Sequence, residues 1–197
     1  TVLELQGTPC LSIEEVAPRQ NIMVSRSFAH KIEDYNELRE AVTLFATNAA
    51  EKLREQHSYC CGLMVFVRTS PFSENDPQYN NSTSLRFVKE TDNTMIILKT
   101  AVMGLKAIFR QGYKYKKAGV MLLETVDKEG RQGDLFIDEN KMHNERLMTA
   151  LDKINDKYGR RTVQFAICGF SKALSLRESV TPGYTTNWDE LLVVHAN

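Results

Sequence analysis

A short peptide at residues 132–136 carries side chains suited to binding another molecule. Gln132 offers an amide, Asp134 a small carboxylate, and Leu135 and Phe136 are adjacent large apolar side chains. The segments at 128–131 and 138–140 are polar and show no periodic apolar face that could bury the pair. Exposed apolar side chains on a polar tether are typical of a peptide that inserts into a pocket of a partner protein. The alternative is that Leu135 and Phe136 pack back onto this chain's own surface.

Basic side chains close to hydroxyl groups form a second group with recognisable chemistry. Arginine or lysine beside serine on a strand suits a surface that contacts phosphates without discriminating between bases. The candidate phosphate-binding residues are Ser25, Arg26, Ser27, Arg68, Arg86, Lys116 and Lys117. The alternative is an ordinary solvated sheet face. Base stacking is less favoured, because no regular aromatic pairs recur on the predicted strands.

Motifs of catalytic and metal-binding sites are absent from the sequence. It contains no Gly-rich phosphate loop, no G-x-S-x-G turn, no H-E-x-x-H and no EF-hand series. Asp189 and Glu190 form an acidic pair, but no second acidic cluster on a strand accompanies them, as metal-dependent nucleotidyl transfer would require. The four cysteines form no C-x-x-C pair, which favours free thiols in a reducing cytosol over a zinc site. We expect no catalytic residue, metal or cofactor in this chain.

Charge is distributed unevenly along a chain whose net charge is zero. Residues 1–18 contain three acids and no Lys or Arg, and residues 129–197 contain 9 Lys and Arg against 10 acids. Residues 19–128 contain 16 Lys and Arg against 12 acids, a net charge of +4, which permits contact with phosphates without requiring it. No apolar run approaches the roughly 20 residues that span a bilayer, so we expect a cytoplasmic protein without membrane contact.

Alternating strand and helix patterns occupy the basic middle part. One predicted helix is capped by Asp34, with Glu37 placed for a capping box, and another begins at residues 92–93 and ends near residue 112. The predicted strands cover residues 22–28, 63–68, 85–88 and 118–123. The resulting β-α-β-β-α-β order predicts an α+β fold, in which two helices cover one face of a four-stranded antiparallel sheet.

Arg26 does not fit this pattern simply. Strict alternation places it on the face of Ile22, Val24 and Phe28, which is the expected core face. Either a bulge turns Arg26 outward, or the outer end of this strand is exposed.

The C-terminal part has a different character. A helix at 144–157 and a strand at 162–168 predict a small α/β unit. The predicted organisation is therefore a linker at 1–18, a sheet domain at 19–128, a linker with the docking peptide at 129–140, and an accessory unit at 141–197.

Taken in order, several segments resemble the C-terminal half of UmuC-type Y-family DNA polymerases, the catalytic subunit type of bacterial DNA polymerase V. These segments are residues 4–10, 25–28, 49–54, 69–72, 115–122, 132–136, 147–149 and 184–186. The pattern Gln-x-Asp/Ser-Leu-Phe itself resembles the peptide by which bacterial polymerases and repair proteins bind the sliding clamp. Asn80 stands where glycine is expected, and Gly183 stands where a basic residue is expected.

The resemblance implies a role for each part. Residues 19–128 would be the little finger, which lies along template-primer DNA and contacts its backbone, and residues 1–18 the end of the thumb with its link. The catalytic carboxylates and magnesium would lie in an upstream palm domain, so this chain is expected to be inactive. The full protein would work with a UmuD-type dimer and RecA in the SOS response.

The leading interpretation is the DNA-binding and clamp-binding portion of an error-prone translesion polymerase. One alternative is a protein-interaction module whose ferredoxin-like sheet does not bind DNA. A complete small enzyme is a third possibility, and the missing motifs disfavour it.

Overall fold

The computed structural model describes residues 2–7, 19–73, 76–128 and 139–169. After the short helix α1 (Val2–Leu5), the elements follow the predicted β-α-β-β-α-β order. They are β1 (Ile22–Ile32), α2 (Tyr35–Glu55), β2 (Ser58–Thr69), β3 (Asn80–Thr91), α3 (Thr94–Ile108) and β4 (Tyr115–Asp127). Helix α4 (Glu139–Tyr158) and the 3-10 helix η1 (Ala166–Cys168) come next.

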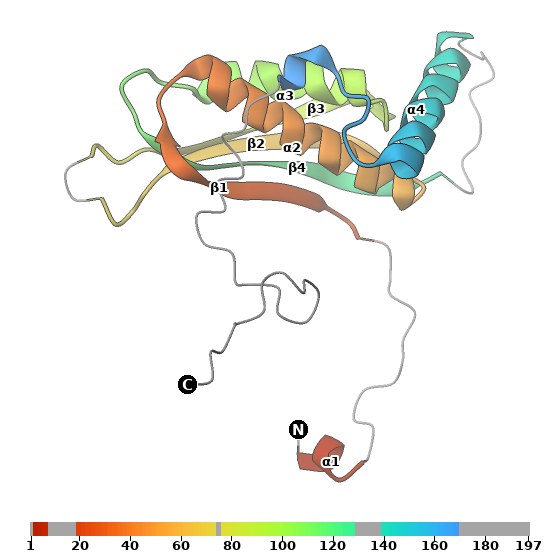
Figure 1. Ribbon diagram of the computed structural model, residues 1–197, viewed down its shortest axis with the longest axis horizontal. Coiled ribbons are helices and arrows are strands. Elements are labelled where there is room, and N and C mark those ends of the chain that lie inside the picture. Colours follow the sequence, from red (N-terminus) through yellow and green to blue (C-terminus); the bar gives the residue numbers. More distant parts are fainter. Residues whose placement is uncertain (1, 8–18, 74–75, 129–138, 170–197) are drawn as a thin grey trace, which may run out of the picture.

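The four strands form one antiparallel sheet in the order β1-β4-β2-β3. Helices α2 and α3 lie side by side on one face of this sheet (Figure 1). Among the residues that the structure describes, no helix covers the other face. The α+β fold predicted from the sequence is therefore confirmed. The strands are longer than predicted. The prediction rested on their apolar centres, and backbone pairing continues beyond these centres into polar residues.

Side-chain caps define where the two covering helices begin. The Asp34 carboxylate accepts a hydrogen bond from the backbone N–H of Glu37 at 2.9 Å, as predicted for an N-cap, while the Glu37 carboxylate contacts the His30 ring at 2.7 Å. The Asn93 side chain accepts one from the backbone N–H of Met95, also at 2.9 Å. Helix α3 ends at Ile108, before the predicted end near residue 112, because Phe109 adopts an extended conformation.

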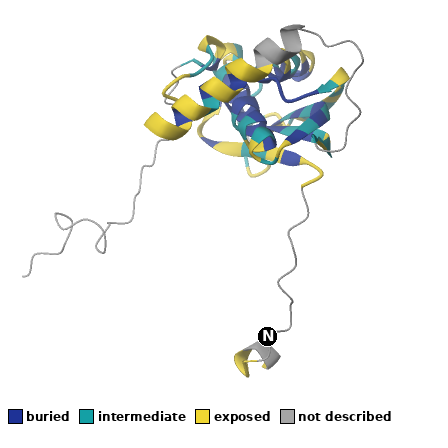
Figure 2. Cartoon of the chain, turned by 90° about the vertical axis from the view of Figure 1, so that its right-hand side faces the viewer, coloured by how far each residue is buried: buried dark blue, intermediate teal, exposed yellow. Residues whose placement is uncertain are grey.

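The core lies between the sheet and helices α2 and α3 (Figure 2). Two cross-strand rows of the covered face supply its floor: Ile22, Leu122, Leu63 and Leu85, followed by Val24, Val120, Val65 and Thr83. Gly104 lets α3 approach the sheet closely, since a Cβ at this position would lie 3.1 Å from Cγ2 of Val65.

The prediction of a strand at residues 162–168 is wrong. In its place the chain runs through an irregular segment into η1, which packs against α2. The Asn155 side chain binds both the N–H and the carbonyl of Val163, at 2.9 and 3.0 Å. The Thr43 hydroxyl contacts the carbonyl of Ile167, and Thr47 contacts the thiol of Cys168. These side chains occupy backbone N–H and carbonyl groups that a strand would use to pair with a sheet. The apolar composition of this segment was therefore not sufficient to form a strand.

Candidate nucleic-acid interface

The uncovered face of the sheet carries four of the predicted phosphate-binding residues in two adjacent cross-strand rows. Ser27 pairs with Lys117, Lys117 with Arg68, and Arg68 with Asn80. Because side chains alternate along strands, this whole row points to the face opposite α2 and α3. We call Ser27, Lys117, Arg68 and Asn80 the basic row. It sets two cations on neighbouring strands, between a hydroxyl and an amide.

The next row on this face has a small polar side chain at each end. It contains Ser25, Gly119, Phe66 and Ser82. A Cβ on Gly119 would lie 2.4 Å from Cβ of Ser25 and 2.5 Å from Cζ of Phe66, so glycine makes room for the phenyl ring. The Phe66 ring therefore lies over Gly119, between the two serines of this row.

Further along the sheet the same face becomes apolar. The next row contains Met23, Met121, Met64 and Ser84, and the row after it Leu123, Gly62 and Arg86. Met23 is half exposed. Arg86 lies three rows from Arg68 and forms an ion pair with Glu124 at 2.5 Å, so a nearby carboxylate already offsets its charge.

Arg26 lies on the other face of the sheet, in the row of Ala118 and Val67. Lys116 stands at an irregularity in the pairing of β4, between Lys117 and Tyr115, and belongs to no cross-strand row. The register is continuous from Ile22 to Ser27, so no bulge turns Arg26 outward. Arg26 is exposed because β1 is an edge strand, and it lines a cavity between β1 and α2. The ammonium of Lys116 donates to the carbonyl of Ala29 at 3.0 Å. The structure thus brings together Ser25, Ser27, Arg68 and Lys117, but not all seven candidates.

A carboxylate with two lysine partners lies at the same end of the sheet as the basic row. Asp76 accepts hydrogen bonds from Lys31 at 2.5 Å and Ser73 at 2.7 Å, and Lys114 lies 3.2 Å away. The hydrogen bond from Lys31, followed by that from Ser73, holds the pKa of Asp76 well below its usual range. No sequence pattern indicated this cluster, because its members come from three separate segments.

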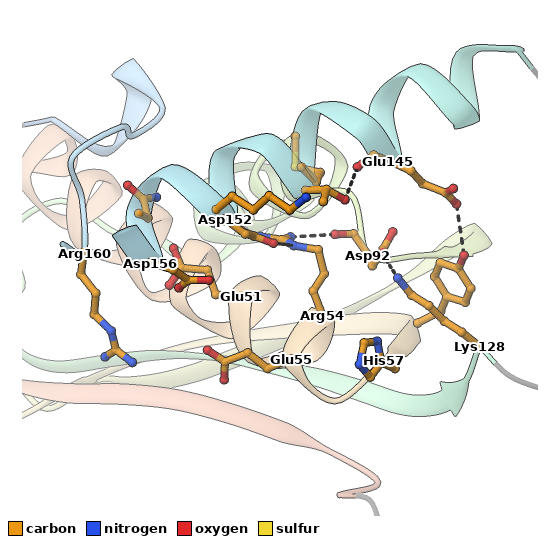
Figure 3. Close-up of a pocket in the computed structure, with 15 residues that line it drawn as sticks. Glu51, Arg54, Glu55, His57, Asp92, Lys128, Glu145, Asp152, Asp156 and Arg160 are labelled. Atoms are coloured by element: carbon orange, nitrogen blue, oxygen red, sulfur yellow. Dashed lines mark hydrogen bonds and ion pairs between the residues drawn. The ribbon is translucent and has the colours of Figure 1, made fainter. Parts of the chain in front are cut away.

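Helix α4 lies at the opposite end of the sheet domain (Figure 1). Arg54 on α2 binds Asp152 on α4 through two hydrogen bonds of 2.6 and 2.7 Å (Figure 3). The same guanidinium donates to the carbonyl of Asp92 and to the hydroxyl of Thr94. The Arg54 side chain is only 9% exposed.

Further contacts surround this ion pair. Met148 and Leu151 of α4 are buried, and Tyr59 donates to Glu145. Lys128, at the end of β4, forms an ion pair with Asp92 (Figure 3). These contacts attach helix α4 to α2 and to the neighbouring end of the sheet.

Glu51 lies in this charged region, and its burial predicts how the stability of the protein depends on pH. Burial raises the pKa of the Glu51 carboxyl, as do Asp152 and Glu55, while Arg54 and Arg160 lower it. A raised pKa in the folded state gives stability that is present at low pH and lost as pH rises through the folded pKa. We expect Glu51→Gln to increase the free energy of unfolding at about pH 8 and to change it little at about pH 4. Urea unfolding at both pH values measures this.

Glu33→Gln is the control, since Glu33 is an exposed acid just before α2 and is not among the charges that shift the pKa of Glu51. A Glu51→Gln chain that is less stable than the parent at both pH values would contradict the prediction.

Several candidate residues fall outside the part of the chain that the structure describes. They are the docking peptide at 132–136 and the acidic pair at 189–190. Among the described residues, no group of three His, Cys, Asp or Glu could hold a metal ion. Cys60, Cys61 and Cys168 are free thiols, and burial raises the pKa of Cys60 to about 12. Within the same ranges, no helix has the length and apolar character needed to cross a membrane.

Known families match two parts of the chain. Residues 19–135 match the impB/mucB/samB family C-terminal domain, and residues 145–194 match a domain of unknown function (DUF4113). The first match covers the α+β sheet domain with its uncovered face. The chain belongs to the impB/mucB/samB family.

Individual relatives agree with this assignment. Protein UmuC of Salmonella typhimurium is 43% identical over 197 residues, which cover 98% of this chain and 47% of that protein. Protein MucB of Escherichia coli is 41% identical over 191 residues, covering 95% of this chain and 45% of that protein. The chain spans about half the length of the curated relatives it matches. The resemblance to UmuC-type proteins predicted from the sequence is confirmed.

A solved structure was also matched, a complex of beta-clamp processivity factor and little finger domain of PolIV. It has a TM-score of 0.40 and 16% sequence identity, and the match covers 59% of this chain and 99% of that chain.

Proposed function

We propose that residues 19–128 bind the backbone of primer-template DNA through the basic row, as part of an error-prone translesion DNA polymerase. The observation that carries the proposal is the adjacency of Lys117 and Arg68 on neighbouring strands of an uncovered sheet face. Ser27, Ser25 and Asn80 add neutral hydrogen-bonding groups around these cations. Cations surrounded by neutral donors suit phosphate oxygens and carry no sequence information.

Two further roles follow from the family. We infer that residues 132–136 bind a sliding clamp, because their sequence has the amide, acid and apolar pair of such peptides. A palm domain elsewhere in the whole protein would supply the magnesium-dependent chemistry, and this chain alone would incorporate no nucleotides. Work on damaged DNA in the SOS response, together with a UmuD-type dimer and RecA, is part of the same proposal. The DNA partner would place the protein in the cytoplasm.

A second candidate function has its own observation. The row of Met23, Met121 and Met64 makes half of the uncovered face apolar. Methionine-rich surfaces adapt to protein partners, so this half favours a protein contact. A protein-interaction module without DNA binding would use this half and leave the basic row solvated.

Salt-dependent binding distinguishes the two functions. We expect Arg68→Ala and Lys117→Ala each to weaken binding to primer-template DNA and to flatten the log–log salt slope by about 0.9 per lost phosphate contact. Fluorescence anisotropy at several salt concentrations measures both quantities. Arg26→Ala and Arg86→Ala should have smaller effects, because Arg26 lies on the other face and Glu124 offsets Arg86.

Lys99→Ala is the matched control, since Lys99 is an exposed cation on α3, on the covered side of the sheet. If Arg68→Ala and Lys117→Ala left affinity and slope as in the Lys99→Ala chain, the basic row would not bind DNA, and the protein-interaction function would be favoured.

A further inference from the structure

The loop between β2 and β3 presents a phenylalanine to solvent next to the basic row. Phe72 is 91% exposed and lies four residues after Arg68. This loop extends beyond the end of the sheet, at the left of Figure 1. Single exposed apolar residues are common on protein surfaces. The surroundings of Phe72 are what make it informative.

The described part of this loop is held in one conformation by its own hydrogen bonds. The Gln78 amide donates to the carbonyls of Ser70 at 2.9 Å and Ser73 at 3.0 Å. Thr69 and Tyr79 close the base of the loop, through N–H to carbonyl and N–H to hydroxyl bonds of 3.0 Å each. Residues 70–73 form a turn in which the N–H of Ser73 reaches the carbonyl of Ser70.

Asp76 ties this loop to the rest of the sheet. Its carboxylate binds Ser73 within the loop, Lys31 on β1 and Lys114 just before β4. The described part of the loop is thus anchored to two further segments at the end of the sheet that carries the basic row. A contact made by a loop ordered in advance does not have to offset the entropy of ordering it.

Several cations lie at the same end of the sheet domain as the exposed ring, and Asp76 offsets the charge of two of them, Lys31 and Lys114. Lys31, Lys114, Lys117, Arg68 and Arg110 all lie at this end of the sheet domain. A ring beside a cationic surface is the arrangement by which proteins hold single-stranded nucleic acid, because cations follow the backbone and aromatic rings stack on bases of any sequence.

We propose that Phe72 stacks on an unpaired base of the DNA strand whose backbone lies on the basic row. The inference rests on the proposed DNA-binding function and adds a preference for DNA with a single-stranded extension. Bases inside a duplex are already stacked on their neighbours, so the ring can only engage a base beyond the duplex end. Such a base lies on the template ahead of the primer terminus.

The test compares two DNAs, a blunt duplex and the same duplex with a single-stranded template extension. The parent chain is expected to bind the extended DNA more tightly. Phe72→Ala should weaken binding to the extended DNA by about tenfold, the effect of losing one stacked base, and leave blunt-duplex binding unchanged. Phe72→Leu should behave like Phe72→Ala because it keeps apolar bulk without a π face, whereas Phe72→Trp should retain the preference.

Val88→Ala is the matched control, since Val88 is a fully exposed apolar residue on β3 away from this loop. A Phe72→Trp chain in a Trp188→Phe background carries a single reporter indole, whose fluorescence should be quenched by the extended DNA and not by the blunt duplex. If Phe72→Ala binds both DNAs as the parent does while Arg68→Ala weakens both, stacking is overturned and the proposed function stands. If neither DNA binds the parent chain, both fail.

Discussion

A chain carrying Asp152→Asn is expected to lose most of the hydrogen-exchange protection of helix α4. The guanidinium of Arg54 would then remain 9% exposed without the carboxylate that binds it, and the neutral acceptors on Asp92 and Thr94 do not compensate its charge. Removing one member of a buried ion pair destabilises a protein by about 3–5 kcal/mol. We expect about 3 kcal/mol here, because Asp152 itself is partly exposed and the helix can open locally to let water reach Arg54.

Exchange of backbone amides across residues 145–158, followed by mass spectrometry, measures the opening of α4, and urea unfolding measures the global stability. Asp156→Asn is the matched control, because Asp156 is an exposed carboxylate one turn further along the same helix. Equal protection and equal urea midpoints in the Asp152→Asn and Asp156→Asn chains would show that the apolar contacts of Met148 and Leu151 hold α4 without the ion pair.

The topology was predictable because local signals agreed with one another. Apolar alternation marked the centres of four strands, and Asp34 and Asn93 marked where two helices begin. The ends of the strands were not predictable in the same way. Residues Asn80 to Ser84 of β3 are polar, and they are strand because β2 pairs with them, which is a tertiary effect.

The candidate site was predictable in residue type but not in arrangement. Which residues share a row depends on the register between strands, and the register separates Arg26 from Lys117 and Arg68. One residue along a strand changes the face, so adjacent candidates in the sequence cannot all belong to one surface. Seven candidate phosphate-binding residues were identified from the sequence, and only the cross-strand pairing shows which of them share a surface.

Contacts between segments far apart in the sequence could not be predicted, because no local sequence pattern indicates them. Asp76 joins Lys31 and Lys114, and Arg54 joins Asp152 at a separation of 98 residues. For the same reason the segment at 162–168 was assigned to a strand, although contacts with α2 and α4 decide its conformation.

Combining Leu135→Ala with Phe136→Ala is expected to abolish detectable binding to a bacterial sliding clamp. In the proposed complex these two side chains fill an apolar pocket, while Gln132 forms hydrogen bonds at its rim. Burying each side chain contributes roughly 1.5–3 kcal/mol, and ordering the peptide opposes part of this gain. The parent affinity should therefore be in the micromolar range, and losing both side chains should weaken it by about two to four orders of magnitude. Titration of the purified clamp, followed by calorimetry, measures the loss.

The same double substitution separates a docking peptide from a segment packed against its own domain. If residues 132–136 serve only a partner, the urea midpoint and the affinity for primer-template DNA should match those of the parent chain. Ile137→Ala is the control, since it removes a neighbouring apolar side chain outside the Gln-x-Asp-Leu-Phe pattern and should leave clamp binding nearly intact. Were the double variant to lower the urea midpoint by the cost of two buried side chains, Leu135 and Phe136 would belong to this chain's own core. The clamp would then have to be bound through another surface, and the apolar half of the sheet around Met23 and Met121 would be the next candidate.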